Sequence, residues 1–365
     1  MSGAEKHLKH LLPALKAQEV DCELLIICPP AAESILDEFC REFSAAGVKA
    51  SLLIVKRQFS LGTLRKLNSF LRKNNFSTVH SHLIRTDLML SLVKQFFYKR
   101  LSIISTKHGY REKVQKHYLP GAFTVRRDLY YWVNRYALSR ISRNISVSAA
   151  ISGLFKNLEL TEKYFPVIYH GVDVAVPPER DYLTFDKNST PQLLIVGRLE
   201  EYKGHRYAFE AMPLILEKFP GTELVLIGEG YYENELRALA GELKISDRVR
   251  FMGFQKDPDP FFNAADVVIV PSLFEPFGLV FIESMGLKKP IACFDVPAGN
   301  ELLDDDSAVL APRADSKALA EKILFLLENP AERKRLAERA FATYIEKHTA
   351  TVMAKNTAAF YRSSE

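Results

Sequence analysis

The stretch VVIVPSLFEPFGLVFIE, residues 267–283, decides the fold. It begins with four β-branched apolar residues, which are typical of a strand buried on both faces. A turn containing Pro276 and Gly278 follows, and the apolar segment from Leu279 onward predicts a helix. A buried strand that passes through a turn into a helix is the unit of a parallel sheet, so this stretch predicts the α/β class.

The same alternation of short apolar strands and amphipathic helices runs along the rest of the chain. In the second half it begins with a predicted strand at 192–196 and continues to a predicted helix at 316–328. In the first half we expect a strand at 24–28 and a helix at 34–46. This pattern predicts two Rossmann-like, doubly wound parallel sheets that face each other across a cleft, with ligands at the carboxyl ends of the strands.

The first predicted element is unusual for such a fold, because it is a helix at 5–17. A Rossmann-like domain normally opens with a strand at the middle of its sheet, followed by a glycine-rich turn. We therefore expect the first amino-terminal strand to be missing from the sheet.

The composition fits a globular protein. The 365 residues are 47% hydrophobic and 25% charged, which excludes a disordered chain, a collagen-like repeat and a small disulfide-stapled domain. No apolar run approaches the roughly 18 residues of a membrane-spanning helix, and residues 1–20 carry charges instead of the apolar core of a secretory signal. The four cysteines show no paired spacing, so we expect a reducing, cytoplasmic environment.

Charge is distributed unevenly between the two halves. Residues 1–180 contain 27 Lys and Arg against 15 Asp and Glu, whereas the remaining residues contain 22 against 29. A basic half favours an anionic partner such as nucleic acid, a membrane leaflet or a phosphorylated lipid. Ordinary variation of surface charge is the alternative.

Two carboxylates, Glu275 and Glu283, lie eight positions apart around the turn and helix of the opening stretch. Between them, the backbone N–H groups of 278–280 are left free at the helix N-terminus, which is a favourable place for a phosphate. The alternative is that the acidic residues only complement the helix dipole.

A second motif, GRLEEYKG at 197–204, directly follows a predicted strand. Its Arg198 and Lys203 are five positions apart, so a forked guanidinium and a point charge could hold a diphosphate from two sides. A solvated basic loop is the alternative.

The two motifs together resemble those of the retaining glycosyltransferases of family 4, which have the GT-B fold. The resemblance is strong from Val167 to Lys347 and continuous but weaker from Gly3 to Ser148. It implies an amino-terminal acceptor-side domain at 1–165, joined by the returning segment 348–365, and a donor-binding domain at 166–347.

The resemblance also implies roles for individual residues. Glu275 would hold hydroxyl groups of the donor sugar, and Glu283 would bind the ribose of the nucleotide. Arg198 and Lys203 would neutralise the diphosphate, and His108, at the end of a predicted strand, would lie beside the donor sugar. The implied catalytic residues are thus His108, Glu275, Arg198 and Lys203. The implied donor-binding residues are Gly3 in a glycine loop, Gly197, Arg198, Lys203, Gly228, Met252, Gly253, Phe254, Glu275, Phe277, Gly278, Leu279, Val280 and Glu283.

Several other motifs suggest a metal or a cofactor but are weak. Gly228 and Gly230 form only part of a dinucleotide-binding fingerprint, because the third glycine is absent. The acidic run 304–306 is interpreted as a solvated loop. His80 and His82 would share one face of a strand, but no carboxylate or third histidine is near in sequence, so we expect a wall of the cleft there. We predict no metal and no cofactor.

The segment 117–143 is rich in aromatic and basic residues, and it is the candidate for the acceptor or membrane side. The aromatic and basic pattern suits an anionic membrane surface or stacking on nucleic acid, although a helix that buries its aromatic face is the alternative. The residues that we assign to this side are His80, Arg126, Arg127, Trp132 and Arg135.

The sequence therefore predicts a retaining, metal-independent glycosyltransferase of the hexosyltransferase type. It would move a sugar from a UDP-, GDP- or ADP-sugar to a surface glycan or a lipid-linked acceptor, as in cell-envelope polysaccharide or lipopolysaccharide synthesis. We expect it in the cytoplasm, peripherally at the cytoplasmic face of the membrane, with no nucleic-acid partner. The alternatives are a GT-B sugar-nucleotide epimerase and a non-catalytic glycan-binding or scaffold relative.

Overall fold

The chain divides into two compact units, which we describe separately. Unit 1 comprises Met1–Gly171 and Ala350–Glu365, and unit 2 comprises Val172–Thr349. The residues that the computed structural model describes are 3–57, 59–110, 127–175 and 190–363.

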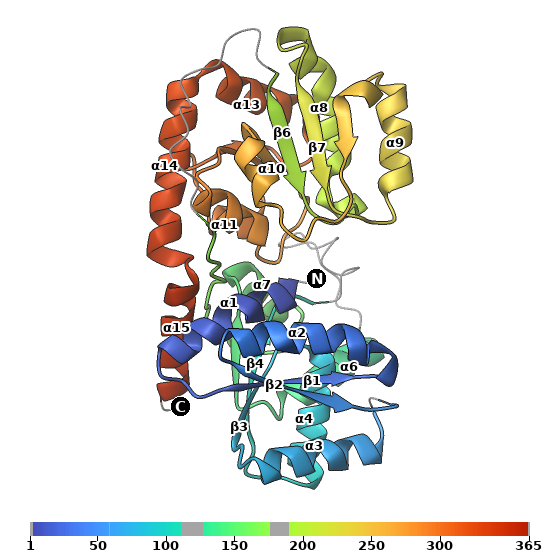
Figure 1. Ribbon diagram of the computed structural model, residues 1–365, viewed down its shortest axis with the longest axis vertical. Coiled ribbons are helices and arrows are strands. Elements are labelled where there is room, and N and C mark those ends of the chain that lie inside the picture. Colours follow the sequence, from blue (N-terminus) through green and yellow to red (C-terminus); the bar gives the residue numbers. More distant parts are fainter. Residues whose placement is uncertain (1–2, 58, 111–126, 176–189, 364–365) are drawn as a thin grey trace. The chain divides into compact units, whose positions relative to one another are not determined.

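Unit 2 is built on a six-stranded parallel sheet with the order β11-β10-β9-β6-β7-β8 (Figure 1). From β6 the chain adds strands toward one edge, and from β9 it adds them toward the other, so the strand order reverses between β6 and β9. In doubly wound folds this reversal marks the ligand site. The strands are β6 (Gln192–Val196), β7 (Glu223–Ile227), β8 (Val249–Phe251), β9 (Val267–Val270), β10 (Ile291–Phe294) and β11 (Val309–Ala311).

Helices cover both faces of this sheet. On one face, Phe209 and Met212 of α8 pack with Ile323 and Leu327 of α13 in one apolar core. On the other face, α11 packs against β9 and α14. The helices of unit 2 are η2 (Glu201–Lys203), α8 (His205–Lys218), α9 (Glu233–Glu242), η3 (Ser246–Arg248), α10 (Asp259–Ala264), α11 (Leu279–Gly286), α12 (Pro297–Asn300), α13 (Ser316–Glu328) and α14 (Pro330–Lys347).

The strands of unit 1 form two separate parallel sheets. β1 (Glu23–Cys28) pairs with β2 (Lys49–Ile54), and β4 (Ser102–Lys107) pairs with both β3 (Thr78–Ser81) and β5 (Arg143–Ser146). Within the described residues no strand joins β1 to β3. The sheet is thus interrupted, as the helical opening of the sequence led us to expect.

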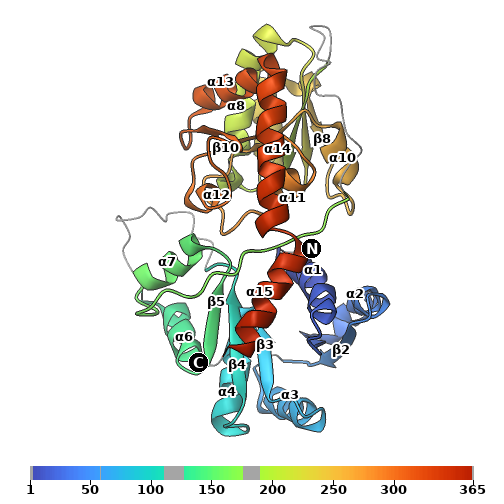
Figure 2. The same cartoon turned by 90° about the vertical axis from the view of Figure 1, so that its left-hand side faces the viewer.

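Among the described residues of unit 1, two apolar cores pack helices against one another and against the strands. The first contains Leu67 of α3 and Val93 of α4, and the second contains Leu15 of α1 and Met353 of α15. Helices α1 and α15 therefore lie side by side, although they are far apart in sequence (Figure 2). The helices are α1 (Gly3–Ala17), η1 (Pro30–Ala32), α2 (Glu33–Ala45), α3 (Leu61–Lys73), α4 (Ile84–Phe96), α6 (Leu129–Leu138), α7 (Ala149–Asn157) and α15 (Ala350–Arg362).

The α/β class and the two Rossmann-like domains are confirmed, although the sheet of the first is divided in two. Most predicted elements end within two residues of the observed ones. The sequence patterns missed α7, β11 and α12. Among the described residues, no helix combines the length and apolarity needed to cross a membrane.

Candidate functional site

The loops that follow β6 and β9 meet at the point where the strand order reverses. Lys203, from the first loop, donates from Nζ to Oε1 of Glu275 in the second loop at 2.5 Å. Ser272 Oγ donates to the same oxygen at 2.8 Å. Glu275 is only 4% exposed, so its carboxylate is a buried charge that is neutralised by one cation and oriented by one hydroxyl.

Glycines allow these loops to approach so closely. Gly204 has φ +69°, and a Cβ there would lie 1.8 Å from the carbonyl oxygen of Pro271. Gly228 has φ +134°, and its Cβ would lie 1.9 Å from the carbonyl oxygen of Gly197. A side chain at either position would clash with the backbone of the neighbouring loop and would strain the backbone of its own residue. Both glycines are therefore needed to bring together the loops that follow β6, β7 and β9.

Arg198 has a different environment from Lys203. Its side chain is 60% exposed, pairs with Glu200 through Nη1 and donates from Nη2 to the hydroxyl of Tyr202 at 2.6 Å. An exposed guanidinium can change partners at little cost. Lys203 is held in place, whereas Arg198 is available to turn toward a ligand.

The N-terminus of α11 completes this site. Gly278 caps the helix with φ +89°, and the first N–H groups of a helix have no partner within it. Val280, in the first turn, lines a narrow pocket together with Gly197, Lys203 and Glu275. The pocket therefore combines a cation, a carboxylate and a helix N-terminus, which is suited to a phosphorylated ligand with hydroxyl groups. Glu283 is buried about one turn after Val280 in α11. Phe277, which was also predicted to bind the donor, is buried just before the start of this helix.

Met252, Gly253 and Phe254, which the resemblance implies to be donor-binding, lie against the end of β7 and the loop that follows it. Gly228 N donates to Gly253 O at 2.9 Å, and Phe254 N donates to Glu229 Oε1 at 3.3 Å. The Phe254 side chain is 56% exposed, so an aromatic face is available for stacking. Met252, which donates from its N–H to Leu226 O, ties this segment to the strand edge.

In unit 1, His108 directly follows β4 at the carboxyl edge of the three-stranded sheet. A buried carboxylate, Asp87 of α4, fixes this edge. It accepts hydrogen bonds from Ser81 of β3, from Ser105 of β4 at 3.0 Å and from Lys107 Nζ at 2.6 Å. The strand ends that carry His82 and His108 are thereby held in register.

His108 belongs to a cluster of five histidine side chains. His82 Nδ1 lies 3.1 Å from His108 Nε2, and His7 Nδ1 lies 2.6 Å from His170 Nδ1. The His80 ring stacks at 4.4 Å from that of His82, and its two nitrogens meet Tyr361 and Thr106. We call His7, His80, His82, His108 and His170 the histidine cluster.

Burial lowers the pKa of every member of the histidine cluster. The pKa of His82 falls to about 4 and that of His170 to about 3, chiefly through desolvation. The pKa values of the other three lie well below the usual value for the same reason, with repulsion from neighbouring rings as a further cause. The rings are therefore neutral at pH 7, and they act as hydrogen-bond partners or ligands instead of cations.

The remaining predicted residues are scattered. Gly3 is the first residue of helix α1, so the structure does not place it in a loop. Arg126 lies outside the described residues. Arg127 pairs with Glu159 at the surface, and Arg135 Nη1 donates to the backbone oxygen of Glu159 at 3.0 Å. Trp132 is 52% exposed on α6, so this aromatic ring at least is not buried on the sheet.

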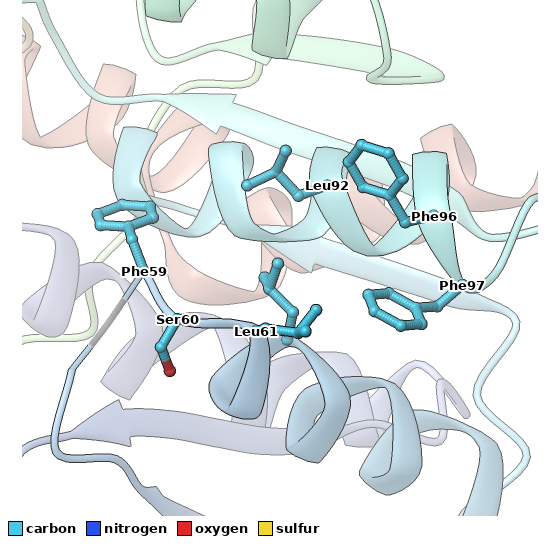
Figure 3. A pocket seen from close by; sticks show the side chains of 7 residues that line it. Phe59, Ser60, Leu61, Leu92, Phe96 and Phe97 are labelled. Atoms are coloured by element: carbon cyan, nitrogen blue, oxygen red, sulfur yellow. The ribbon is translucent and has the colours of Figure 1, made fainter.

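A separate apolar pocket of about 430 Å³ lies between α3 and α4 (Figure 3). Phe59 and Leu61 approach it from the start of α3, and Leu92, Phe96 and Phe97 approach it from α4. The sequence patterns did not predict this pocket, which contains no charged lining residue.

The sequence patterns did not indicate several residues of these sites. Ser272 could have been noticed, because it lies in the same turn as Glu275. The partners of Arg198, which are Glu200 and Tyr202, lie inside the quoted GRLEEYKG motif. His7 and His170 gave no such signal, because they come from segments far from the other histidines in the chain.

The fold and the site together define a class of proteins. Two Rossmann-like units, with a pocket where the strand order of the second reverses, are the architecture of GT-B proteins. The chain belongs to the glycosyltransferases of family 4: residues 1–176 match the model of Glycosyltransferase Family 4, and residues 184–343 match that of Glycosyl transferases group 1.

Individual relatives are distant. The chain is 28% identical to alpha-D-kanosaminyltransferase of Streptomyces kanamyceticus over 47% of this chain and 45% of that protein. It thus spans about half the length of that relative. It is 25% identical to glycogen synthase of Mycobacterium tuberculosis over 93% of this chain and 86% of that protein. The lipopolysaccharide core biosynthesis glycosyltransferase LpsE of Rhizobium meliloti is 32% identical over 42% of this chain and 45% of its own.

Among solved structures, Anabaena HepE in complex with UDP is similar over the whole of this chain and 97% of its own, with a TM-score of 0.78 and 18% identity. Sucrose-phosphate synthase from Thermosynechococcus elongatus covers 93% of this chain and 98% of its own, with a TM-score of 0.72 and 20% identity. These likenesses support the fold.

Proposed function

We propose that this protein transfers a sugar from a nucleotide-sugar donor, without a metal and with retention of the anomeric configuration, to a surface glycan or a lipid-linked acceptor. The observation that carries the proposal is the pocket of unit 2, where Lys203 and Glu275 meet beside the N-terminus of α11. The donor would be a UDP-, GDP- or ADP-sugar.

The pocket suits the charge changes of glycosyl transfer. As the bond between sugar and diphosphate breaks, negative charge grows on the diphosphate and positive charge grows on the sugar carbon. Lys203 and the N–H groups at the start of α11 would stabilise the diphosphate without reorganising, and the exposed Arg198 would turn from Glu200 toward it. Because Lys203 already binds Glu275, it would bridge the diphosphate and the carboxylate that holds the sugar hydroxyls.

His108 would serve the transfer as a neutral ring. Burial keeps the pKa of its imidazole well below neutral pH, so the ring would accept or donate a hydrogen bond with a sugar hydroxyl and would add no charge. This fits a reaction in which the departing diphosphate carries the charge that has to be neutralised.

The acceptor side of the proposal draws on unit 1. Arg127, Trp132 and Arg135 are partly exposed around α6, and the first half of the chain is strongly basic. A lipid-linked acceptor would place this face at an anionic membrane. In flotation experiments we expect binding to vesicles that contain anionic lipid at low salt, and weaker binding at high salt. Failure to float at low salt would contradict the membrane part.

The donor reaction is tested by incubating the full chain with UDP-, GDP- and ADP-sugars in the presence of EDTA. We expect one donor to be hydrolysed slowly without an acceptor, and the Glu275→Gln variant to lose at least about 100-fold of that rate. The matched control is Glu201→Gln, an exposed carboxylate in the loop that carries Lys203.

Other outcomes favour the alternatives. A changed sugar configuration in the recovered sugar nucleotide would favour the epimerase. No nucleotide binding in calorimetry would favour the scaffold. Loss of hydrolysis in EDTA that returns with Mg²⁺ would contradict the metal-independent mechanism. NMR of the anomeric proton in the first-formed product tests retention.

A further inference from the structure

Three histidines from three elements of unit 1 converge on one point. His7 comes from α1, His82 directly follows β3, and His108 directly follows β4. One ring nitrogen from each lies within 4.8 Å of those from the other two. Ligand nitrogens around a tetrahedral zinc ion are about 3.4 Å apart, and His82 Nδ1 and His108 Nε2 are already 3.1 Å apart. Only small ring movements would therefore close the three nitrogens around an ion.

One of these rings carries a candidate ligand nitrogen that lacks a hydrogen-bond partner in the part of the chain that the structure describes. This atom is His7 Nε2, and it is buried. Buried polar atoms in native proteins nearly always have a partner, and an orphan atom calls for an explanation such as an ion. The His7 ring is only 4% exposed.

His170 orients His7 in the way that metal-binding histidines require. His170 Nδ1 lies 2.6 Å from His7 Nδ1. When His7 donates its Nδ1 proton to His170, Nε2 is left with a bare lone pair, which is the form that binds a metal. His80 is not a candidate ligand, because both of its nitrogens meet oxygen partners, Tyr361 and Thr106.

We propose that His7, His82 and His108 bind one divalent transition-metal ion of the zinc type. Three imidazoles with water in the fourth position form the usual open tetrahedral site. Imidazole nitrogen favours zinc, copper or nickel over magnesium and calcium, which prefer oxygen ligands. His170 is a positioning residue that acts through His7.

The ion site goes beyond the proposed glycosyl transfer, which needs no metal. It shares His108 with that reaction, so an ion bound there would inhibit the transfer by occupying the ring that is proposed to meet the donor sugar. This inhibition rests on the proposed function, whereas the ion site itself does not.

The test measures the ion directly. The full chain is prepared without a polyhistidine tag, stripped with a chelator, dialysed against Zn²⁺ and analysed by elemental mass spectrometry. We expect one zinc per chain, and X-ray absorption of the zinc-loaded protein should count three imidazole ligands.

Variants assign the ligands. His7→Gln and His82→Gln should each abolish stoichiometric binding, and His170→Gln should weaken it about 10- to 100-fold, the usual effect of an outer-shell partner. His10→Gln, on the same helix as His7, is the matched control and should retain one zinc. Circular dichroism verifies that each variant is folded. If one is not, the imidazole count on the unmodified chain decides.

Three results would overturn the proposal: fewer than 0.5 zinc per chain at about 100 μM free Zn²⁺, two or fewer imidazoles in the absorption spectrum, or unchanged binding in folded His7→Gln and His82→Gln. Donor hydrolysis is measured separately on the metal-free protein. A failure of the ion site and a failure of the glycosyltransferase proposal are therefore distinguishable.

Discussion

Lys203 and Arg198 are two cations of one sequence motif, but their side chains differ in how deeply they are buried. Lys203 neutralises the buried carboxylate of Glu275, and its own side chain is only 18% exposed. Arg198 is 60% exposed and pairs with Glu200. We therefore expect the first ion pair to contribute more to stability than the second.

We therefore expect Lys203→Met to lower the free energy of unfolding of unit 2 by about 2 kcal/mol. This is below the cost of breaking a fully buried pair, because Lys203 keeps some contact with water. Arg198→Met should cost less than about 1 kcal/mol, although both variants should weaken donor binding. Urea unfolding measures the first quantity. The double variant Lys203→Met/Glu275→Gln should recover part of the stability lost in Lys203→Met. Equal losses of stability in Lys203→Met and Arg198→Met would refute the distinction between the two cations.

His205, at the start of α8, makes the stability of unit 2 depend on pH. Burial lowers the pKa of this imidazole to about 3, whereas in the unfolded chain it is about 6.5. Between these values the unfolded state binds a proton that the folded state does not, so stability falls as the pH falls. The slope is up to about 1.4 kcal/mol per pH unit for this one group.

The measurement is the urea unfolding of unit 2 at pH 7.5, 6 and 5, compared with His205→Gln. The variant should be less dependent on pH than the unmodified chain over this range. Parallel curves for the two proteins would show that His205 does not carry the effect.

At the level of elements, the glycine turns set the geometry of the pocket that we propose for the donor. Gly204→Ala would place a Cβ 1.8 Å from the carbonyl oxygen of Pro271 in a left-handed conformation. The loop after β6 must then move away from the loop after β9, which separates Lys203 from Glu275. We expect a loss of at least about 2 kcal/mol of stability, together with weaker donor binding.

The matched substitution is Gly241→Ala, in helix α9. A Cβ there meets no atom within 4 Å, and alanine is the better helix former, so stability should rise by about 0.5–1 kcal/mol. Thermal unfolding compares the two variants. If both changed stability equally, the close contact at Gly204 would not be the cause.

The elements themselves were largely predictable from the sequence, because most strands and helices are long enough to show the periodic spacing of apolar residues that is typical of them. β11 has only three residues and α12 only four, so neither covers enough chain to produce a recognisable pattern.

The site was predictable only where its residues lie close together in the sequence. Glu275 and the N-terminus of α11 come from one short stretch, and the sequence brought them together correctly. The partner of Glu275 is also a motif residue, yet the ion pair with Lys203 depends on the adjacency of β6 and β9. The histidine cluster depends on packing between α1 and two strand ends, and no local spacing encodes that.

At the scale of the whole molecule, the last helix is part of the core of the first unit. Met353, Ala354 and Ala358 of α15 are buried against Leu11 and Leu15 of α1. Phe43 of α2 and Val48 belong to the same core, so α15 covers one part of the apolar face of α1. The boundary of unit 1 therefore cannot be drawn at one point in the sequence.

Removal of residues 350–365 should thus unfold unit 1 and spare unit 2. We expect rapid proteolysis within 1–171 and retention of a resistant fragment from 190–349. The control is removal of 363–365 alone, beyond the end of α15, which should leave the proteolysis pattern unchanged. Equal resistance of both units after the longer truncation would contradict this view of the core.

The same helix has a consequence for how the protein is made. Domains usually fold as units during synthesis, with the amino-terminal one first. Here unit 1 leaves the ribosome first but must wait for α15, the final helix, before its core can close. Unit 2, whose segment Val172–Thr349 is continuous, can complete its fold earlier. During synthesis the part of the α1 apolar face that α15 covers stays exposed until unit 2 has been translated. Of these two units, the one that is translated earlier is therefore completed later.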